Sequence, residues 1–254
     1  MSGYPWAYFS SGPRAAVLKQ LLSEDVEISG VYVTDPEYWP KVASTVDLAN
    51  EMGLPVHILR RADLSTPIAA LRGACCLSVG FGYILPKVFL QHVRVCLNVH
   101  GTLLPKYPGA RSLNWVIANG EQESGVTVHI VDEGVDTGPI VLQRAFELSP
   151  FETSASIARK TLAFEPGVVI EALRRYERDG PLGATPQPAG QAARAPDRVP
   201  AHSQIDPEKS LSSLFNEIRA ADPDRFPAHF YVDGQKVCVR VWRPEKPADE
   251  SDLV

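Results

Sequence analysis

The sequence has few cysteines and no long apolar run. None of the four cysteines, Cys75, Cys76, Cys96 and Cys238, is placed at a CxxC spacing. We therefore predict buried, reduced thiols rather than metal ligands or a disulfide framework. No apolar run approaches the ~18 residues that cross a membrane, so we predict no membrane partner. The N-terminus lacks a basic segment followed by an apolar stretch, which favours a cytoplasmic protein.

Positive charge and a dinucleotide fingerprint are also lacking. The net charge is -5 and the isoelectric point is near 5.7. These values argue against a nucleic-acid partner, whose phosphates need many cations, but they allow a small phosphorylated ligand. The turn "SSGPR" (10–14) follows the first apolar run without the GxGxxG spacing. We therefore predict no nicotinamide or flavin cofactor.

Short apolar runs alternate with amphipathic segments through the first half of the chain. This pattern is typical of an α/β fold with a mostly parallel sheet flanked by helices. The predicted strands cover 6–10, 28–34, 55–59, 75–81 and 95–99, and the predicted helices cover 13–24 and 39–53. Two alternating runs, 124–131 and 139–146, predict an antiparallel pair, and a long helix is predicted over 154–178.

The C-terminal third changes in composition. Residues 181–203 are rich in proline, alanine and glycine and predict a linker after a catalytic domain of residues 1–180. Residues 204–246 predict a small subdomain of one helix and one hairpin around Asp233-Gly234, and residues 247–254 a disordered tail. The helix has an apolar face that must be buried, formed by Leu211, Leu214, Phe215 and Ile218.

Two polar residues end the buried run at 95–99. Asn98 and His100 are two positions apart, so they share one face of a strand at the carboxyl edge of the sheet, where ligands collect. An amide donor beside an imidazole can hold a developing oxyanion and move a proton. Taken alone, the pair fits two hydrogen-bonded residues at a strand end better than a catalytic pair, so the surrounding sequence has to decide.

The surrounding sequence resembles a known family. The run "NVHGTLLPKYPG" and the later "NGEQESGVTVHIVDEGVDTGPIVLQ" are similar to the signature of the folate-dependent formyltransferases, which act on glycinamide ribonucleotide, methionyl-tRNA or nucleotide sugars. The resemblance runs from the first strand to about residue 178. It implies an enzyme with a Rossmann-like sheet and a catalytic trio of Asn98, His100 and Asp136.

The resemblance also implies that 10-formyltetrahydrofolate is the co-substrate and is held largely by backbone groups. The cofactor-binding residues that it implies are Phe81, Gly82, Tyr83, Ile84, Leu85, Val131, Asp132 and Glu133. The substrate-binding residues that it suggests are Ser11, Gly12, Arg14, Lys106 and Arg111. As an alternative, residues 10–14 form a plain turn before a helix.

Formyl transfer to an amine passes through a tetrahedral oxyanion, and the attacking amine must give up a surplus proton. Asn98 suits the oxyanion, His100 can serve both needs, and Asp136 can stabilise the imidazolium or orient a water. The chemistry requires no metal. We predict that His129 is a hydrogen-bonded structural histidine, because it alternates with apolar neighbours in its strand.

The choice of the amine acceptor is narrowed by two sequence stretches and by the charge of the C-terminal region. The nucleotide-sugar branch of the family is resembled by two stretches, "HGTLLPKY" and "IDPEKSLSSLFNEIRAADPDRFPAHF". Residues 181–254 carry a net charge of -2, from 9 Lys and Arg against 11 Asp and Glu, which makes a poor surface for tRNA. Pro108 and Ala110 stand where that branch commonly has arginines, which leaves the base (dTDP, GDP or UDP) and the sugar open.

We therefore predict a dimeric, cytoplasmic sugar-nucleotide N-formyltransferase that modifies a nucleotide-linked amino deoxy sugar for glycan biosynthesis. One alternative is an N-formyltransferase for an amino acid, a siderophore precursor or methionyl-tRNA. A folate-binding protein without turnover is a third reading, disfavoured by the intact trio.

Overall fold

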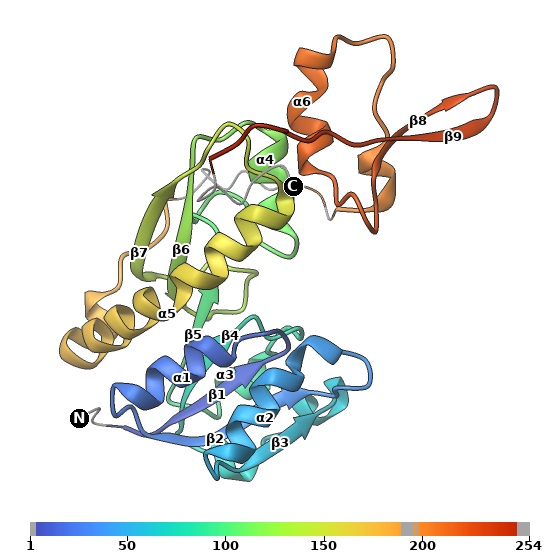
Figure 1. The fold of residues 1–254 in the computed structure, drawn as a ribbon. Coiled ribbons are helices and arrows are strands. Elements are labelled where there is room, and N and C mark those ends of the chain that lie inside the picture. Colours follow the sequence, from blue (N-terminus) through green and yellow to red (C-terminus); the bar gives the residue numbers. More distant parts are fainter. Residues whose placement is uncertain (1–3, 189–195, 197, 248–254) are drawn as a thin grey trace.

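The computed structural model describes residues 4–188, 196 and 198–247. Seven strands form one sheet in the order β3-β2-β1-β4-β5-β6-β7 (Figure 1). The strands are β1 (Trp6–Ser10), β2 (Ile28–Thr34), β3 (Val56–Leu59), β4 (Cys75–Val79), β5 (Val95–His100), β6 (Glu123–Ile130) and β7 (Ile140–Glu147). The first five are parallel, and β6 and β7 are antiparallel. The predicted Rossmann-like, mostly parallel α/β fold is confirmed.

Helices cover both faces of this sheet. The α-helices are α1 (Ala15–Ser23), α2 (Ala43–Glu51), α3 (Lys87–Leu90), α4 (Ser112–Ala118), α5 (Ser154–Asp179) and α6 (Leu211–Ala220). Short 3₁₀ turns are η1 (Pro40–Val42), η2 (Arg61–Ser65), η3 (Ala69–Leu71), η4 (Gly180–Gly183) and η5 (Pro200–Ser203). The long helix α5 starts at a capping residue, Thr153, whose side chain accepts a hydrogen bond from the Ser156 N–H.

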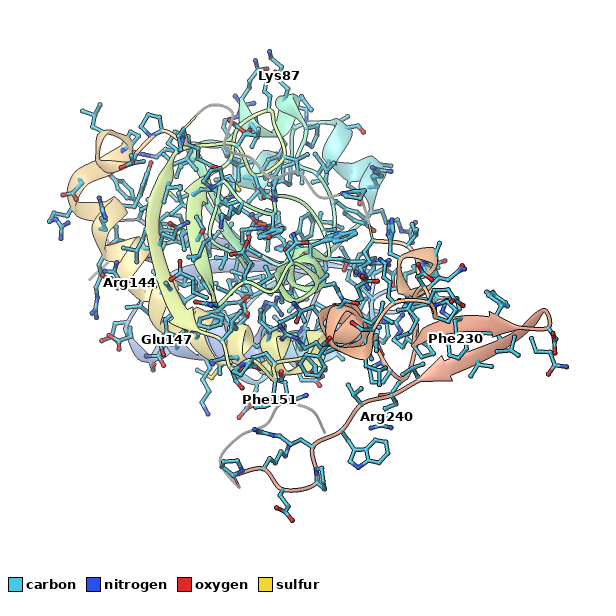
Figure 2. All side chains as sticks on the ribbon, turned by 90° about the horizontal axis from the view of Figure 1, so that it is seen from above. Lys87, Arg144, Glu147, Phe151, Phe230 and Arg240 are labelled. Atoms are coloured by element: carbon cyan, nitrogen blue, oxygen red, sulfur yellow. The ribbon has the colours of Figure 1, made fainter. Side chains whose placement is uncertain are left out.

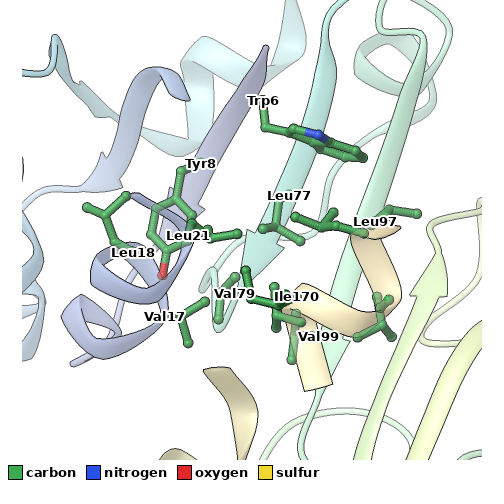
Figure 3. Packing of buried hydrophobic residues seen from close by; sticks show 14 of the residues in the cluster. Trp6, Tyr8, Val17, Leu18, Leu21, Leu77, Val79, Leu97, Val99 and Ile170 are labelled. Carbon is green, nitrogen blue, oxygen red and sulfur yellow. The ribbon is translucent and has the colours of Figure 1, made fainter. Parts of the chain in front are cut away.

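The alternation of side chains along each strand divides the core between the two faces. On one face, Trp6, Leu77 and Leu97 of the strands pack against helices α1 and α5 (Figure 3). On the other face, a second cluster contains Phe9 and Cys96, covered by α3 and the short turns. Asn98 and His100 continue the face of Cys96, because side chains two apart in a strand point the same way.

The cysteine prediction is confirmed for three residues and wrong for one. Cys75, Cys76 and Cys96 are free and buried, and burial raises the pKa of the Cys76 and Cys96 thiols. Cys238 is free but exposed, because it lies on a hairpin of only two strands, β8 (Ala228–Val232) and β9 (Gln235–Val239), with too little structure to cover it.

The predicted helix and hairpin are both present at the C-terminal end. Helix α6 packs against α4, and the hairpin projects away from the sheet (Figures 1 and 2). Asn114 donates a hydrogen bond to the Ala220 carbonyl at 2.7 Å, and buried Arg219 donates to the Glu152 carbonyl at 2.6 Å. The expectation for Leu211 is wrong: it is 75% exposed, because the first turn of α6 points that side chain to solvent.

Part of the segment after α5 is hydrogen-bonded to the sheet, although its composition predicts a linker. Thr185 forms two backbone hydrogen bonds with Ile140 of β7, both 2.8 Å. The domain boundaries at 180/181 and 203/204 stay predictions, and the tail from residue 248 lies outside the described residues. Within the described part of the chain, no helix combines the length and apolar character that crossing a bilayer requires.

Candidate functional site

Four polar side chains meet at the carboxyl edge of β5. Asn98 and His100 come from β5 itself, and His129 of β6 lies directly opposite Asn98 in the strand register. Asp136 is carried by the loop between β6 and β7, and its carboxylate reaches both Asn98 and His100. The structure thus brings together the three residues expected to form the catalytic trio, with His129 as a fourth.

The Asp136 carboxylate lies at the centre of this cluster. Its Oδ1 accepts a hydrogen bond from Asn98 Nδ2 at 3.2 Å and lies 3.4 Å from His129 Nε2. Its Oδ2 accepts from the Gly109 N–H at 2.8 Å and lies 3.3 Å from His100 Nδ1. Burial alone would raise the pKa of Asp136, but His129, His100 and the Gly109 N–H hold it well below its usual range. The group is therefore a carboxylate at neutral pH.

His100 has a defined tautomer. Its Nε2 lies 2.8 Å from the Tyr107 carbonyl oxygen, which can only accept, so Nε2 carries hydrogen and Nδ1 faces Asp136. Burial lowers the pKa of His100 from its usual 6.5, although Asp136 and the Tyr107 carbonyl oppose this shift. With Nε2–H directed at that carbonyl, Nδ1 is the nitrogen that can take up a proton, beside the Asp136 carboxylate.

The amide of Asn98 is oriented by its neighbour on β4. The Ser78 hydroxyl donates to Asn98 Oδ1 at 2.8 Å, because an amide oxygen is an acceptor. The nitrogen Nδ2 therefore points to Asp136 and presents N–H groups to the site. A hydroxyl beside the amide oxygen thus turns Asn98 into a directed hydrogen-bond donor.

His129 is both buried and part of the cluster. It is 2% exposed, and its Nδ1 lies 3.0 Å from the Ile130 carbonyl oxygen, in keeping with the predicted hydrogen-bonded histidine. Its Nε2, however, faces Asp136 and lies 3.2 Å from Asn98 Nδ2. These contacts of His129 follow from the register of β5 against β6 and could not be predicted from the sequence pattern of β6 alone.

A cavity of about 400 Å³ opens beside the cluster and contains Asn98, His100 and Asp136 in its wall. Seven of the eight residues expected to bind the cofactor line it, namely Phe81, Gly82, Tyr83, Ile84, Leu85, Val131 and Asp132. Glu133 does not line the cavity. It pairs with Lys87 at 2.7 Å, and both side chains are exposed.

Trp39 is a wall residue of this cavity that the sequence patterns did not single out. It lies in the loop after β2 and packs against Gly82, where an added Cβ atom would come within 2.6 Å of the indole ring. Gly82 is thus required by a close approach between two loops. The two adjacent aromatic residues Tyr38 and Trp39 are the sequence feature that could have signalled it.

Three of the residues expected to bind the substrate, Ser11, Gly12 and Arg14, do not line the cavity. Ser11 Oγ accepts a hydrogen bond from the Gly82 N–H at 2.7 Å and so fastens the segment that lines the cavity. Arg14 Nε lies 2.8 Å from Glu165 Oε2 of α5, with Gly12 beside the guanidinium. Burial raises the pKa of Glu165 to about 6, and Arg14 opposes this shift.

The structure does not bring Lys106 or Arg111 into the cavity. Lys106 pairs with Glu121 at 3.3 Å and lines a separate hollow of about 500 Å³. Arg111 donates to the Arg198 carbonyl at 2.9 Å. Gly109 and Ala110 of the same loop do line the cavity, so that loop contributes backbone there and not a cation.

Comparisons of sequence point to one family. The formyl transferase family matches residues 35–173, more than half of the chain. The methionyl-tRNA formyltransferase of a Synechococcus strain is 37% identical over 167 residues, 65% of this chain and 52% of that protein. That of Clostridioides difficile is 34% identical over 227 residues, 84% of this chain and 72% of that protein. The chain spans about half the length of the first of these relatives.

Comparisons of structure extend over nearly the whole chain. A suggested sugar N-formyltransferase from Mycobacterium tuberculosis is 24% identical, with a TM-score of 0.73 over 97% of this chain and 100% of that one. An N-formyltransferase of Helicobacter canadensis, solved with folinic acid and dTDP-3-aminofucose, is 20% identical, with a TM-score of 0.67 over 92% and 86%. At these identities the likeness shows the shared fold. From its sequence match, the chain belongs to the formyl transferase family.

Proposed function

We propose that this protein transfers the formyl group of 10-formyltetrahydrofolate to the amine of a nucleotide-linked amino deoxy sugar. The observation that carries the transfer is the Asp136 carboxylate, which contacts both Asn98 Nδ2 and His100 Nδ1 in the wall of the cavity. A nitrogen that can accept the proton of the amine and an N–H that can stabilise the oxyanion thus lie beside the same carboxylate. Formyl transfer to an amine requires both groups.

Each member of the trio has a separate task in this proposal. His100 takes the surplus proton of the amine at Nδ1, since its Nε2–H is committed to the Tyr107 carbonyl. It can pass that proton to the nitrogen that would leave with tetrahydrofolate, so that the transfer releases no net proton. Asp136 stabilises the resulting imidazolium from 3.3 Å. Asn98 donates an N–H to the oxygen on which negative charge develops, in exchange for one of the contacts that its Nδ2 makes with Asp136 and His129, both at 3.2 Å. The catalytic rate should therefore fall on the acid side with an apparent pKa below 6.5, when His100 is already protonated.

The cavity is suited to a folate. Its volume of about 400 Å³ lies within the range of small-molecule sites, and three aromatic side chains line it, those of Trp39, Phe81 and Tyr83. Bound 10-formyltetrahydrofolate would supply an activated formyl group. The rings of Phe81 and Tyr83 pack edge to face with their centroids 5.5 Å apart, so this part of the wall is already ordered before a ligand binds.

The C-terminal region supports a small acceptor. Residues 181–254 carry a net charge of -2, which is unsuited to a polyanionic tRNA. The Helicobacter canadensis neighbour, whose structure contains dTDP-3-aminofucose, matches 92% of this chain. Methionyl-tRNA is the second candidate, favoured by the names of the relatives with 34–37% identity. A cytoplasmic homodimer acting in glycan biosynthesis belongs to the same proposal.

The test is a formylation panel that follows release of tetrahydrofolate. Purified protein and 10-formyltetrahydrofolate are incubated with dTDP-, GDP- and UDP-linked 3- and 4-amino sugars, with charged initiator tRNA, and with free amino acids. We expect turnover with at least one sugar nucleotide. Turnover on initiator tRNA with none on any sugar nucleotide would refute the proposed acceptor and leave formyl transfer in place.

A further inference from the structure

The side-chain amide of Gln187 holds the turn that carries Asp136. Its Nε2 donates one hydrogen bond to the Asp136 carbonyl and one to the Gly138 carbonyl, both at 2.8 Å. A primary amide nitrogen has two hydrogens, so both are used on this turn. Gln187 lies 51 residues further along the chain, in the segment whose composition predicts a linker.

The turn needs external support. Asp136 has a φ of +54°, a left-handed conformation that costs a non-glycine residue roughly 1 kcal/mol or more. Gly138 is packed so closely on β6 that a Cβ atom would lie 1.8 Å from the Ile130 carbonyl oxygen. One side of the turn is therefore held by this packing, and within the loop the Thr137 hydroxyl donates to the Asp132 carboxylate at 2.7 Å. Gln187 adds a contact from outside the loop that bridges residues 136 and 138.

The position of Gln187 is itself restricted by its neighbours. Thr185 is paired with Ile140 by two backbone hydrogen bonds, which bring the chain back along β7 after α5 (Figure 1). Pro186 and Pro188 flank Gln187, and each proline limits its own φ and the conformation of the residue before it. The amide is therefore presented to the turn by a short, stiff piece of chain.

We propose that Gln187 is a positioning residue for Asp136, and that residues 184–188 belong to the catalytic unit. By fixing the backbone of Asp136 and Gly138, Gln187 keeps the carboxylate 3.3 Å from His100 Nδ1. The titratable groups that face His100 are Asp136 and His129, while Tyr107 faces it with a backbone carbonyl. Loosening Asp136 removes the group that favours protonated His100, so histidine titration reports the effect directly.

The test compares Gln187→Met, which keeps the length of the side chain and removes its donors, with Gln204→Met, which changes an exposed glutamine outside the site. Two readouts are taken on the full-length protein: ¹⁵N NMR titration of the His100 ring, assigned with His100→Asn, and the pH profile of kcat. In Gln187→Met we expect the pKa of His100 to fall by about 0.5 or more, because an attractive charge recedes. We expect kcat to fall about tenfold or more, since small displacements of catalytic groups are costly.

The kinetic readout rests on the proposed function, whereas the titration does not. A shifted His100 titration in a protein that formylates no amine would retain the positioning role and refute the proposed function. An unshifted titration with unchanged kcat would overturn the inference, as would equal shifts in Gln204→Met. If Gln187→Met does not fold, Gln187→Ala, which leaves room for water at the two carbonyls, is measured in the same way.

Discussion

At the scale of single residues, the site depends on which atom of each side chain is already occupied. Tyr107 offers a carbonyl to His100 Nε2, and Ser78 offers a hydroxyl to Asn98 Oδ1. These two contacts leave His100 Nδ1 and Asn98 Nδ2 facing Asp136. The directional chemistry of the site is therefore set by neighbours that take no part in the proposed reaction.

His100→Asn separates a catalytic role from a structural one. If Nδ1 accepts the proton of the amine, we expect kcat to fall by about 10²–10⁴ while the stability changes by about 1 kcal/mol. Folate affinity should be retained, because the aromatic wall and the backbone of residues 80–86 are untouched. Turnover, folate binding and thermal unfolding are measured together.

The matched control for this prediction is His57→Asn. His57 is exposed on β3 and stacks on Tyr32, remote from the Asp136 cluster.

Asp136→Asn should lose activity comparably to His100→Asn, and the double variant should be little worse than either, because the two residues act as one unit. Near-normal turnover in a folded His100→Asn protein would remove the catalytic assignment.

At the scale of elements, the cavity is built by loops that brace one another. The loop after β1 accepts a hydrogen bond from the loop after β4 through Ser11 and the Gly82 N–H. The loop after β2 adds Trp39, which packs against that same glycine. Three strand ends that are distant in the sequence thus shape one wall, as expected at the carboxyl edge of a parallel sheet.

Gly82→Ala tests this wall. The new methyl group would lie 2.6 Å from the Trp39 ring, so the indole must move away. We expect the KM for 10-formyltetrahydrofolate to rise by roughly tenfold, equivalent to about 1.4 kcal/mol of lost binding, with a smaller change in kcat. Steady-state kinetics at saturating acceptor measure both values.

Gly167→Ala serves as the comparison, since a Cβ atom at that position meets nothing within 4 Å. An unchanged KM in Gly82→Ala would show that the indole does not contribute to the folate site.

At the scale of the whole molecule, the C-terminal region is joined to the main sheet by polar and apolar contacts. Ala220 belongs to the same apolar cluster as Val116, Ile117 and Ile157. Buried Arg219 reaches the Glu152 carbonyl ahead of α5. Helix α6 therefore completes a surface of the main domain and is not an independent appendage.

A chain ended after Pro188, which keeps Gln187 and removes α6, should expose this surface. We expect at least about 2 kcal/mol of lost stability, or about 4–8 °C in Tm, and lower solubility. Differential scanning calorimetry and size-exclusion chromatography measure these effects. A chain ended after Lys246 is the control. Unchanged Tm, oligomeric state and activity after the cut at Pro188 would show that the contacts of α6 contribute nothing.

The sequence by itself determined the strands, the main helices and the C-terminal hairpin. Local patterning carries this information: period-two apolar runs, helical spacing and an Asp-Gly turn are all contained in short windows. The pairing of Asn98 with His100 could also be read from their spacing of two. That Asp136 joins them was implied only by the resemblance of the surrounding sequence to the folate-dependent formyltransferases.

Only the tertiary structure decided which further residues join the site. His129 enters through the register of β5 against β6, Trp39 through a loop packed on Gly82, and Gln187 through a segment that returns along β7. It also decided that Lys106 and Arg111 face other partners. These outcomes depend on contacts between residues tens of positions apart, which local periodicity does not encode.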